Sequence, residues 1–294
     1  MTLRAILMGL AFALMWSSAF ATARIIVAHA PPLFSLSLRF FISGLIAVLL
    51  ARALGQSWHL PGGWRGPQAR SVLVFGLCQN ALYLGLNFVA MQKIEGSLAA
   101  IIASAMPLMV AGLGWLWFRE KVSTLGIVGL LTGMAGVAVI MGSRLQGGAD
   151  PLSVGLCVAG ALALAVATLS VRGASGSGNL LMIVGLQMLV GAVVLAIVSG
   201  LTEAGSVDVT SAYIWAMAYQ IFVPGLAATL LWFSLVRDLG AVRAATFHFL
   251  NPAFGVAVAA LLLGERISAT DVLGVAIAMA GILAVQLSKV RVRP

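Results

Sequence analysis

Polar side chains recur at regular spacing inside two apolar runs of this 294-residue chain. In the first run, Gln79, Asn80, Tyr83 and Asn87 follow one another at spacings that place them on one face of a helix. Polar side chains also hydrogen-bond membrane helices to each other, at about 0.6 kcal/mol per interaction. Because four of them share one stripe, we expect this face to line a cavity rather than only to join helices.

The second run carries His248 and Asn251, which lie three residues apart and therefore also share a face. For a lone histidine in such a run we favour a hydrogen-bonded packing role over proton transfer. Nucleophilic catalysis would need a serine beside this base, and Ser17 or Ser104 could supply the hydroxyl. No motif supports that chemistry, so we expect no enzymatic activity.

Prolines interrupt two apolar runs near their middle, at Pro107 and Pro252. A proline inside a helix frees the carbonyl four residues earlier, here that of Ala103 or His248. In lipid, freed carbonyls need partners, so broken helices face protein or a wet cavity. The alternative is a kink that only curves the helix. We favour a kink that also lines a cavity, and Pro224 fits the same interpretation.

Aromatic side chains could supply flat apolar walls for a ring. Trp16 lies deep in the first apolar run and Tyr83 shares the polar stripe, so both are candidates, and Tyr219 and Trp232 are further ones. Trp115 suits an interfacial anchor instead. An aromatic amino acid would need such walls together with a few polar groups for its ammonium and carboxylate.

The elements that must position these residues are membrane helices. Hydrophobic residues make up 62% of the chain and charged residues 9%, whereas soluble domains carry about 45–50% and about 25%. A spanning helix needs about 20 mostly apolar residues. We therefore expect an all-α membrane protein with ten spans: 5–23, 32–51, 69–91, 96–118, 124–142, 152–171, 179–200, 212–235, 241–263 and 269–288.

The net charge of +9 is a topology feature rather than a nucleic-acid patch. With the N-terminus inside, predicted cytoplasmic segments hold twelve Lys and Arg residues, and the opposite side holds four: Arg24, Lys93, Arg144 and Arg266. This positive-inside bias predicts that both termini face the cytoplasm. Cys78 and Cys157 lie inside predicted spans and suit packing, so we expect no metal and no cofactor.

A repeat runs through the chain at an offset of 145 residues. The stretch "PLMVAGLGWLWFREKVS" at 107–123 shares Pro, Glu, a basic residue, a β-branched residue and Ser with "PAFGVAVAALLLGERIS" at 252–268. Glycines at 129 and 274, and at 136 and 281, keep the same offset. The alternative to a true repeat is that helices rich in small residues resemble one another by chance.

Each half then holds five spans, residues 1–147 and 148–294. Because five is odd, the second half enters the membrane from the opposite side. We therefore predict two inverted five-helix repeats around a central cavity, an architecture typical of secondary transporters. Within the first half, Gly129 and Gly133 form a GxxxG motif that predicts close helix packing.

A family resemblance rests on "LMWSSAF" (14–20), the Pro-to-Glu runs and the glycine-rich fifth and tenth spans. These features resemble the EamA family of the drug/metabolite transporter superfamily, and most of all its aromatic amino-acid exporters of the YddG type. The resemblance covers the whole chain. It implies ten helices, cytoplasmic termini, a central cavity and export of metabolites or amino acids.

The energy source is predicted from what the spans contain. No acidic residue lies at the centre of a predicted span, and buried carboxylates mark proton pathways. The small multidrug relatives carry a glutamate in their first helix, where this sequence has Met15, Trp16 and Ser17. Glu120 and Glu265, at helix ends, suit a structural role. Arg39 either extends to the interface or attracts a carboxylate, and the sequence leaves both open.

We therefore predict a multi-pass protein of the bacterial inner membrane that exports small neutral metabolites, amino acids including aromatic ones, by alternating access without ion coupling. The alternative is an exporter of nucleobases, sugar derivatives or drugs with the same fold. The expected partners are a small-molecule substrate and the lipid bilayer, without nucleic acid. A monomer is sufficient for such a cavity, and the sequence leaves a homo-oligomer open.

Overall fold

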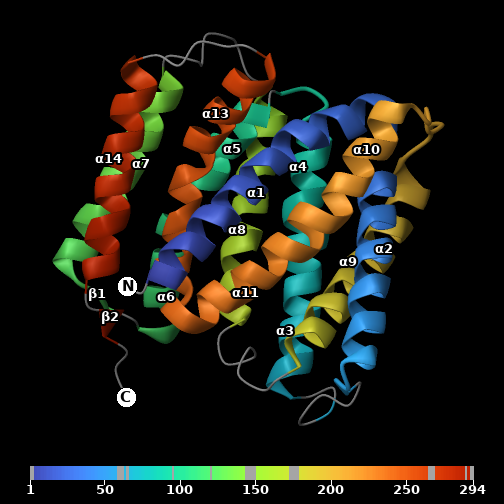
Figure 1. Ribbon diagram of the computed structural model, residues 1–294, viewed down its shortest axis with the longest axis horizontal. Helices are drawn as coiled ribbons and strands as arrows, with labels where there is room; N and C mark the ends of the chain where they lie inside the picture. Colours follow the sequence, from blue (N-terminus) through green and yellow to red (C-terminus); the bar gives the residue numbers. More distant parts are fainter. Residues whose placement is uncertain are drawn as a thin grey trace.

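The computed structural model describes residues 3–57, 63, 66–94, 96–119, 121–142, 150–171, 179–263, 269–288 and 290–291, and these are almost entirely helical (Figure 1). The first half contains α1 (Leu3–His29), α2 (Pro32–Ala53), α3 (Pro67–Phe75), the π-helix η2 (Gly76–Leu84), α4 (Gly85–Ala90), α5 (Gly96–Ser104), α6 (Met106–Phe118) and α7 (Thr124–Gly142). Glu120, Arg144, Glu265 and Arg266 lie outside the described residues.

The second half contains α8 (Pro151–Ser170), α9 (Leu180–Thr202), α10 (Ser211–Gln220), the π-helix η3 (Ile221–Ala227), α11 (Ala228–Leu239), α12 (Ala241–Ala245), the 3-10 helix η4 (Thr246–Leu250), α13 (Asn251–Leu263) and α14 (Ala269–Leu287). A short antiparallel pair, β1 (Lys121–Val122) and β2 (Val290–Arg291), joins the start of α7 to the chain after α14. α1 continues six residues beyond the predicted end at 23, because Pro31 is the first proline to stop it.

Seven helical stretches of the described chain are long and apolar enough to cross a membrane: Leu3–His29, Pro32–Ala53, Pro67–Ala90, Leu98–Phe118, Pro151–Ser170, Leu180–Thr202 and Ser211–Leu239. Helix occupies all ten ranges expected from the sequence, whereas ten membrane spans stay a prediction. Large apolar side chains are exposed on the outside, among them Leu7, Leu49, Leu131, Val193 and Leu283. Such an apolar exterior suits lipid contact.

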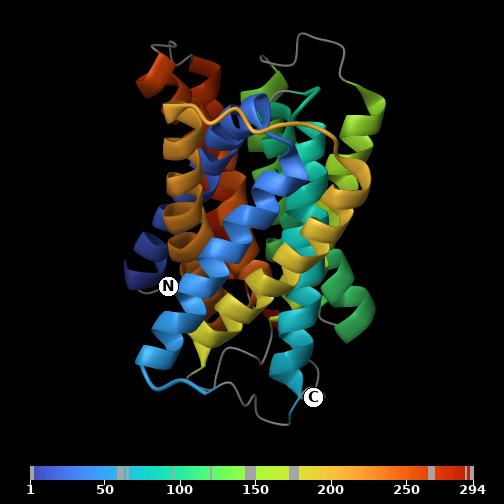
Figure 2. The same ribbon diagram turned by 90° about the vertical axis from the view of Figure 1, so that its right-hand side faces the viewer.

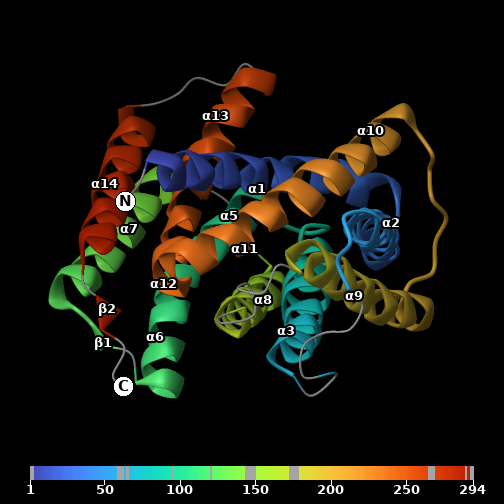
Figure 3. The same ribbon diagram turned by 60° about the horizontal axis from the view of Figure 1, so that its bottom comes forward.

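Two helix pairs flank the molecule. α7 and α14 lie side by side on the left of Figure 1, and α2 and α9 lie together on the right. Figure 3 shows most of the other helices between these pairs. Figure 2 faces the second pair and shows α2 and α9 running alongside each other. Each pair therefore joins one helix from each half of the chain.

Glycines allow both pairs to approach closely. A Cβ added at Gly129 of α7 would lie 2.8 Å from the Gly281 carbonyl oxygen of α14, and one at Gly44 of α2 would lie 3.0 Å from that of Gly185 in α9. Backbone atoms cannot move aside as a flexible side chain can. The close packing predicted from the GxxxG motif is thus confirmed, and glycine is required at the contact.

The helices between these pairs are irregular at matching places in the two halves. π-helical turns follow α3 and α10, at η2 and η3, and Pro224 lies inside η3. α5 and α6 are separated at Ala105, and the 3-10 helix η4 interrupts the helix before α13. Pro107 and Pro252 each stand second in the helix that follows the interruption. The wider π turn also changes which way the polar side chains of η2 face.

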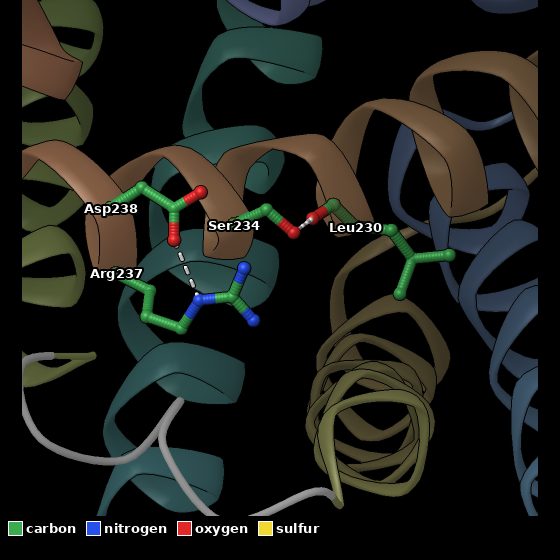
Figure 4. Close-up of polar contacts among 4 residues, drawn as sticks. All are labelled: Leu230, Ser234, Arg237 and Asp238. Atoms are coloured by element: carbon green, nitrogen blue, oxygen red, sulfur yellow. Dashed lines mark hydrogen bonds and ion pairs between the residues drawn. The ribbon is translucent and has the colours of Figure 1, made fainter. Parts of the chain in front are cut away.

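The polar contacts at the end of α11 are local (Figure 4). The Ser234 hydroxyl donates to the Leu230 carbonyl over 2.9 Å, and Arg237 Nε lies 2.8 Å from Asp238 Oδ1. Both charged side chains are more than a third exposed, so the ion pair stabilises the fold by about 0–1 kcal/mol. This end of α11 takes no part in the site below.

Candidate functional site

Four buried rings pack together where α1, α11 and η4 meet. Phe12 stacks on Trp232 with ring centroids 4.9 Å apart, and the His248 imidazole meets both edge-on, at 5.3 and 5.2 Å. Trp16 contacts Phe12 at 5.4 Å and His248 at 5.7 Å. Such distances are within the range of favourable aromatic pairs. The cluster unites the candidates Trp16, Trp232 and His248 and adds Phe12.

A chain of hydrogen bonds fixes this cluster from one side. Asn251 Nδ2 lies 3.0 Å from His248 Nδ1, so the imidazole nitrogen accepts from the amide. The Ser17 hydroxyl donates to the Ala13 carbonyl over 2.6 Å and also lies 3.3 Å from Asn251 Oδ1. The Ser104 hydroxyl donates to the Ala100 carbonyl over 2.8 Å and also lies 3.2 Å from the His248 carbonyl oxygen, the acceptor that Pro252 was expected to free. Neither serine hydroxyl has a hydrogen bond to the imidazole within the described structure. In this arrangement His248 is a packing residue fixed by its hydrogen bond to Asn251, rather than the base of a Ser–His pair.

A small cavity lies beside the cluster. Trp16 forms one wall and Tyr83 of η2 another, with centroids 6.2 Å apart and planes only 10° from parallel. The space is about 20 Å³, which fits about one water molecule. Its lining residues are Trp16, Ala19, Phe20, Ala23, Arg39, Tyr83, Leu84, Asn87, Phe88, Met91 and Pro224. The site is therefore closed, and a substrate enters only if helices or side chains move.

Polar atoms in this cavity wall are only partly paired. Asn87 Nδ2 donates to the Tyr83 carbonyl over 2.8 Å, while its buried Oδ1 has no hydrogen-bond partner among the described residues. Gly160 of α8 allows this arrangement, because a Cβ there would lie 2.8 Å from Asn87 Nδ2. Arg39 of α2 is 3% exposed, and its Nε and Nη1 are likewise without partners in the described chain.

The other half of the predicted polar stripe faces a different neighbour. Asn80 donates to the Gln187 carbonyl of α9 over 3.0 Å and also contacts the Gln187 side-chain oxygen. Gln79 is buried, and its Oε1 has no partner among the residues that the structure describes. Asn80 thus joins two helices, while Tyr83 and Asn87 line the cavity. The π turn of η2 separates side chains that an α-helix would align.

The remaining candidates lie around the cavity without lining it. The Tyr219 hydroxyl lies 2.7 Å from that of Ser18, and Tyr219 is half-buried. Ala103, Pro107 and Pro252 are buried at the interruptions near Ala105 and η4. They shape the helices that hold His248, and they are not among the residues that line this cavity.

A larger open vestibule of about 690 Å³ lies one helical turn further along the same helices. Val27 and Leu33 line it with apolar surface, and His29, Gln92 and Glu203 contribute polar groups. Glu203 accepts from the backbone N–H groups of Leu33 and Phe34 over 2.8 and 2.9 Å and so caps α2. Between vestibule and cavity, Arg24 donates to the carbonyls of Met91 and Ile94 over 2.8 and 2.9 Å.

Comparison with known proteins decides the family. The model of the EamA-like transporter family matches residues 3–142 and again residues 152–287. The chain belongs to the EamA-like transporter family. It is therefore a multi-pass membrane protein of a transporter family within the drug/metabolite superfamily, as the resemblance predicted.

Relatives of this EamA-like protein are also named as transporters. It is 28% identical over 290 residues to "Uncharacterized inner membrane transporter YedA" of Escherichia coli K12, covering 96% of this chain and 91% of that one. It is 26% identical over 257 residues to "Uncharacterized transporter YvbV" of Bacillus subtilis, covering 87% and 82%. A crystal structure with 21% identity superposes with a TM-score of 0.77 over 97% of this chain and 98% of that one. That likeness supports the fold alone.

Several residues of the candidate site were not predicted from the sequence. Phe12 is one apolar residue among many, and Gln187 and Gln220 were not singled out. Gln220 donates to the Ala19 carbonyl and the Thr22 hydroxyl, both over 2.8 Å, and so ties α10 to the cavity wall. A polar residue in an apolar run was the available indication for both glutamines.

Proposed function

We propose that this EamA-like transporter exports small neutral metabolites across the bacterial inner membrane, amino acids with aromatic side chains among them. The observation that carries this proposal is the closed cavity that the Trp16 and Tyr83 rings line. It combines flat apolar walls with Asn87 Oδ1, which has no hydrogen-bond partner among the described residues. An aromatic amino acid needs this combination, because its ring is apolar and its two charged groups must keep polar partners.

Alternating access between two inverted repeats is the proposed mechanism. It is supported by the π-helical turns at η2 and η3, the interruptions near Ala105 and η4, and the close pairing of α2 with α9 and of α7 with α14. Inverted repeats let one cavity open to either side by similar movements. In this mechanism the Arg24 contacts with Met91 and Ile94 separate when the cavity opens to the vestibule.

Movement down a substrate gradient, without ion coupling, is the proposed energy source. The acidic side chains with described partners lie at helix ends: Asp150 caps α8, Glu203 caps α2, and Asp238 pairs with Arg237. A carboxylate in the cavity wall would be the expected proton carrier, and the described lining contains none.

Uptake into proteoliposomes with a panel of labelled amino acids and nucleosides tests this function. Transport of aromatic amino acids, and weaker transport of small aliphatic ones, is the expected result. Stacked walls also suit nucleobases, so transport of nucleosides without amino acids would favour that alternative and reject the amino-acid assignment. Sugar derivatives and drugs serve as further members of the panel.

A further inference from the structure

Arg39 of α2 is a buried charged side chain that has no counter-ion among the described residues. It is 3% exposed, lines the cavity with Trp16 and Tyr83, and its Nε and Nη1 have no hydrogen-bond partner among the described residues. The guanidinium carbon lies 5.0 Å from the Phe40 ring centroid, a contact that offsets only part of the cost of desolvating the charge. Such residues are costly in membranes and mark functional sites.

Extension to the interface does not explain this placement. Arg39 lies seven residues after the start of α2 at Pro32, which is about 10 Å along a helix. Its side chain nevertheless borders the enclosed cavity instead of the open vestibule, where Leu33 of the same helix lies. Of the two roles left open by the sequence, attraction of a carboxylate is the one that fits.

The protein itself supplies no carboxylate to Arg39 within the described residues. Glu203 accepts from Leu33, Phe34 and Ser199, Asp150 accepts from Ser153, and Asp238 pairs with Arg237. A planar guanidinium matches a carboxylate in both shape and charge. The missing partner is therefore a group that the substrate can bring.

We propose that Arg39 binds the carboxylate of the substrate, so that the transporter selects organic carboxylates, amino acids among them, over ring compounds without one. This inference rests on the proposed function and names the substrate class of the same cavity. Asn87 Oδ1, also unpaired in the cavity wall, then accepts from the ammonium of an amino acid. The two aromatic walls hold the side chain.

Three probes with the same ring separate these contacts: L-phenylalanine, 3-phenylpropionate, which lacks the ammonium, and phenethylamine, which lacks the carboxylate. Affinities are measured on the purified full-length protein from ligand-induced thermal stabilisation, which grows with ligand concentration relative to Kd. For the unmodified chain, we expect phenethylamine to bind about 10- to 100-fold more weakly than phenylalanine, because a hydrogen bond to a charged group is lost.

Arg39→Met should remove this preference and weaken phenylalanine binding by about 10- to 100-fold, with Arg39→Lys restoring part of it. Arg52→Met, at the exposed end of the same helix, is the matched control and should change neither affinity. Without ligand, Arg39→Met should keep or raise the Tm, since it removes an unpaired buried charge. A purely structural arginine would instead lower the Tm.

Three results would overturn the inference. The first is equal binding of phenylalanine and phenethylamine by the unmodified chain, and the second is an unchanged phenylalanine affinity in Arg39→Met. The third is a large fall in the Tm of Arg39→Met together with loss of binding of all three probes. If the unmodified chain transports phenylalanine while Arg39→Met binds it equally well, the Arg39 assignment alone fails. If the unmodified chain transports no amino acid, the proposed function fails with it.

Discussion

At the scale of single residues, the central feature is the pair of nearly parallel rings, Trp16 and Tyr83. A substrate ring stacked on one of them gains about 0.5–1.5 kcal/mol. Trp16→Ala and Tyr83→Ala should therefore weaken binding of phenylalanine about threefold to tenfold and binding of alanine less. The dissociation constants of the two amino acids, measured on each purified variant, check this prediction.

Trp115→Ala is the control, because this tryptophan is 62% exposed on α6, away from the cavity. Equal, mild effects of all three substitutions on both amino acids would place substrate binding elsewhere. Asn251→Ala should lower the Tm and weaken binding of all amino acids alike, because His248 Nδ1 loses the amide that donates to it. An unchanged Tm would show that this hydrogen-bond chain contributes little.

The residue types of the site could be predicted from sequence, but their neighbours could not. Polar and aromatic residues in apolar runs stand out, which is why Trp16, Tyr83, Asn87 and His248 were expected. Phe12 does not stand out, because its place in the cluster depends on how α1 meets α11 and η4. For Arg39 the sequence left both extension to the interface and attraction of a carboxylate open, because the neighbours of its side chain depend on how α2 packs.

At the scale of elements, glycine contacts determine how closely the paired helices approach. Gly129→Ala should destabilise the protein by about 1–3 kcal/mol, because the added methyl overpacks against the Gly281 carbonyl and Val285 backbone of α14. Gly155→Ala on α8 is the matched control, since a Cβ there meets nothing within 4 Å. Thermal unfolding in detergent should show a lower Tm for the first variant only.

An equal Tm for both glycine variants would mean that α7 and α14 can separate without cost.

These helices were predictable as elements, because lipid requires long apolar runs with paired backbone groups. The π turns η2 and η3 were not, because a turn of i to i+5 hydrogen bonds has no spacing signature and depends on neighbouring helices. That is why Asn80 and Asn87, assigned to one face, contact different neighbours.

At the scale of the whole molecule, the inverted arrangement can be tested by labelling both ends of two matching stretches. In a background without Cys78 and Cys157, single cysteines replace Arg70 and Lys93 around α3–α4, and Ser211 and Asp238 around α10–α11. We expect reagents outside the cell to label positions 93 and 211, and positions 70 and 238 only after permeabilisation. Labelling of 238 but not 211 from outside would reject inversion.

Uncoupled exchange of amino acids through one cavity that opens to either side is tested most directly by counterflow. Proteoliposomes containing the purified chain are loaded with unlabelled phenylalanine and diluted into labelled phenylalanine, with equal pH and no membrane potential. We expect transient accumulation of label above its external concentration, and no accumulation in liposomes without protein. Accumulation of label only under an imposed proton gradient would contradict uncoupled exchange. So would the absence of accumulation with a purified protein that is known to bind phenylalanine.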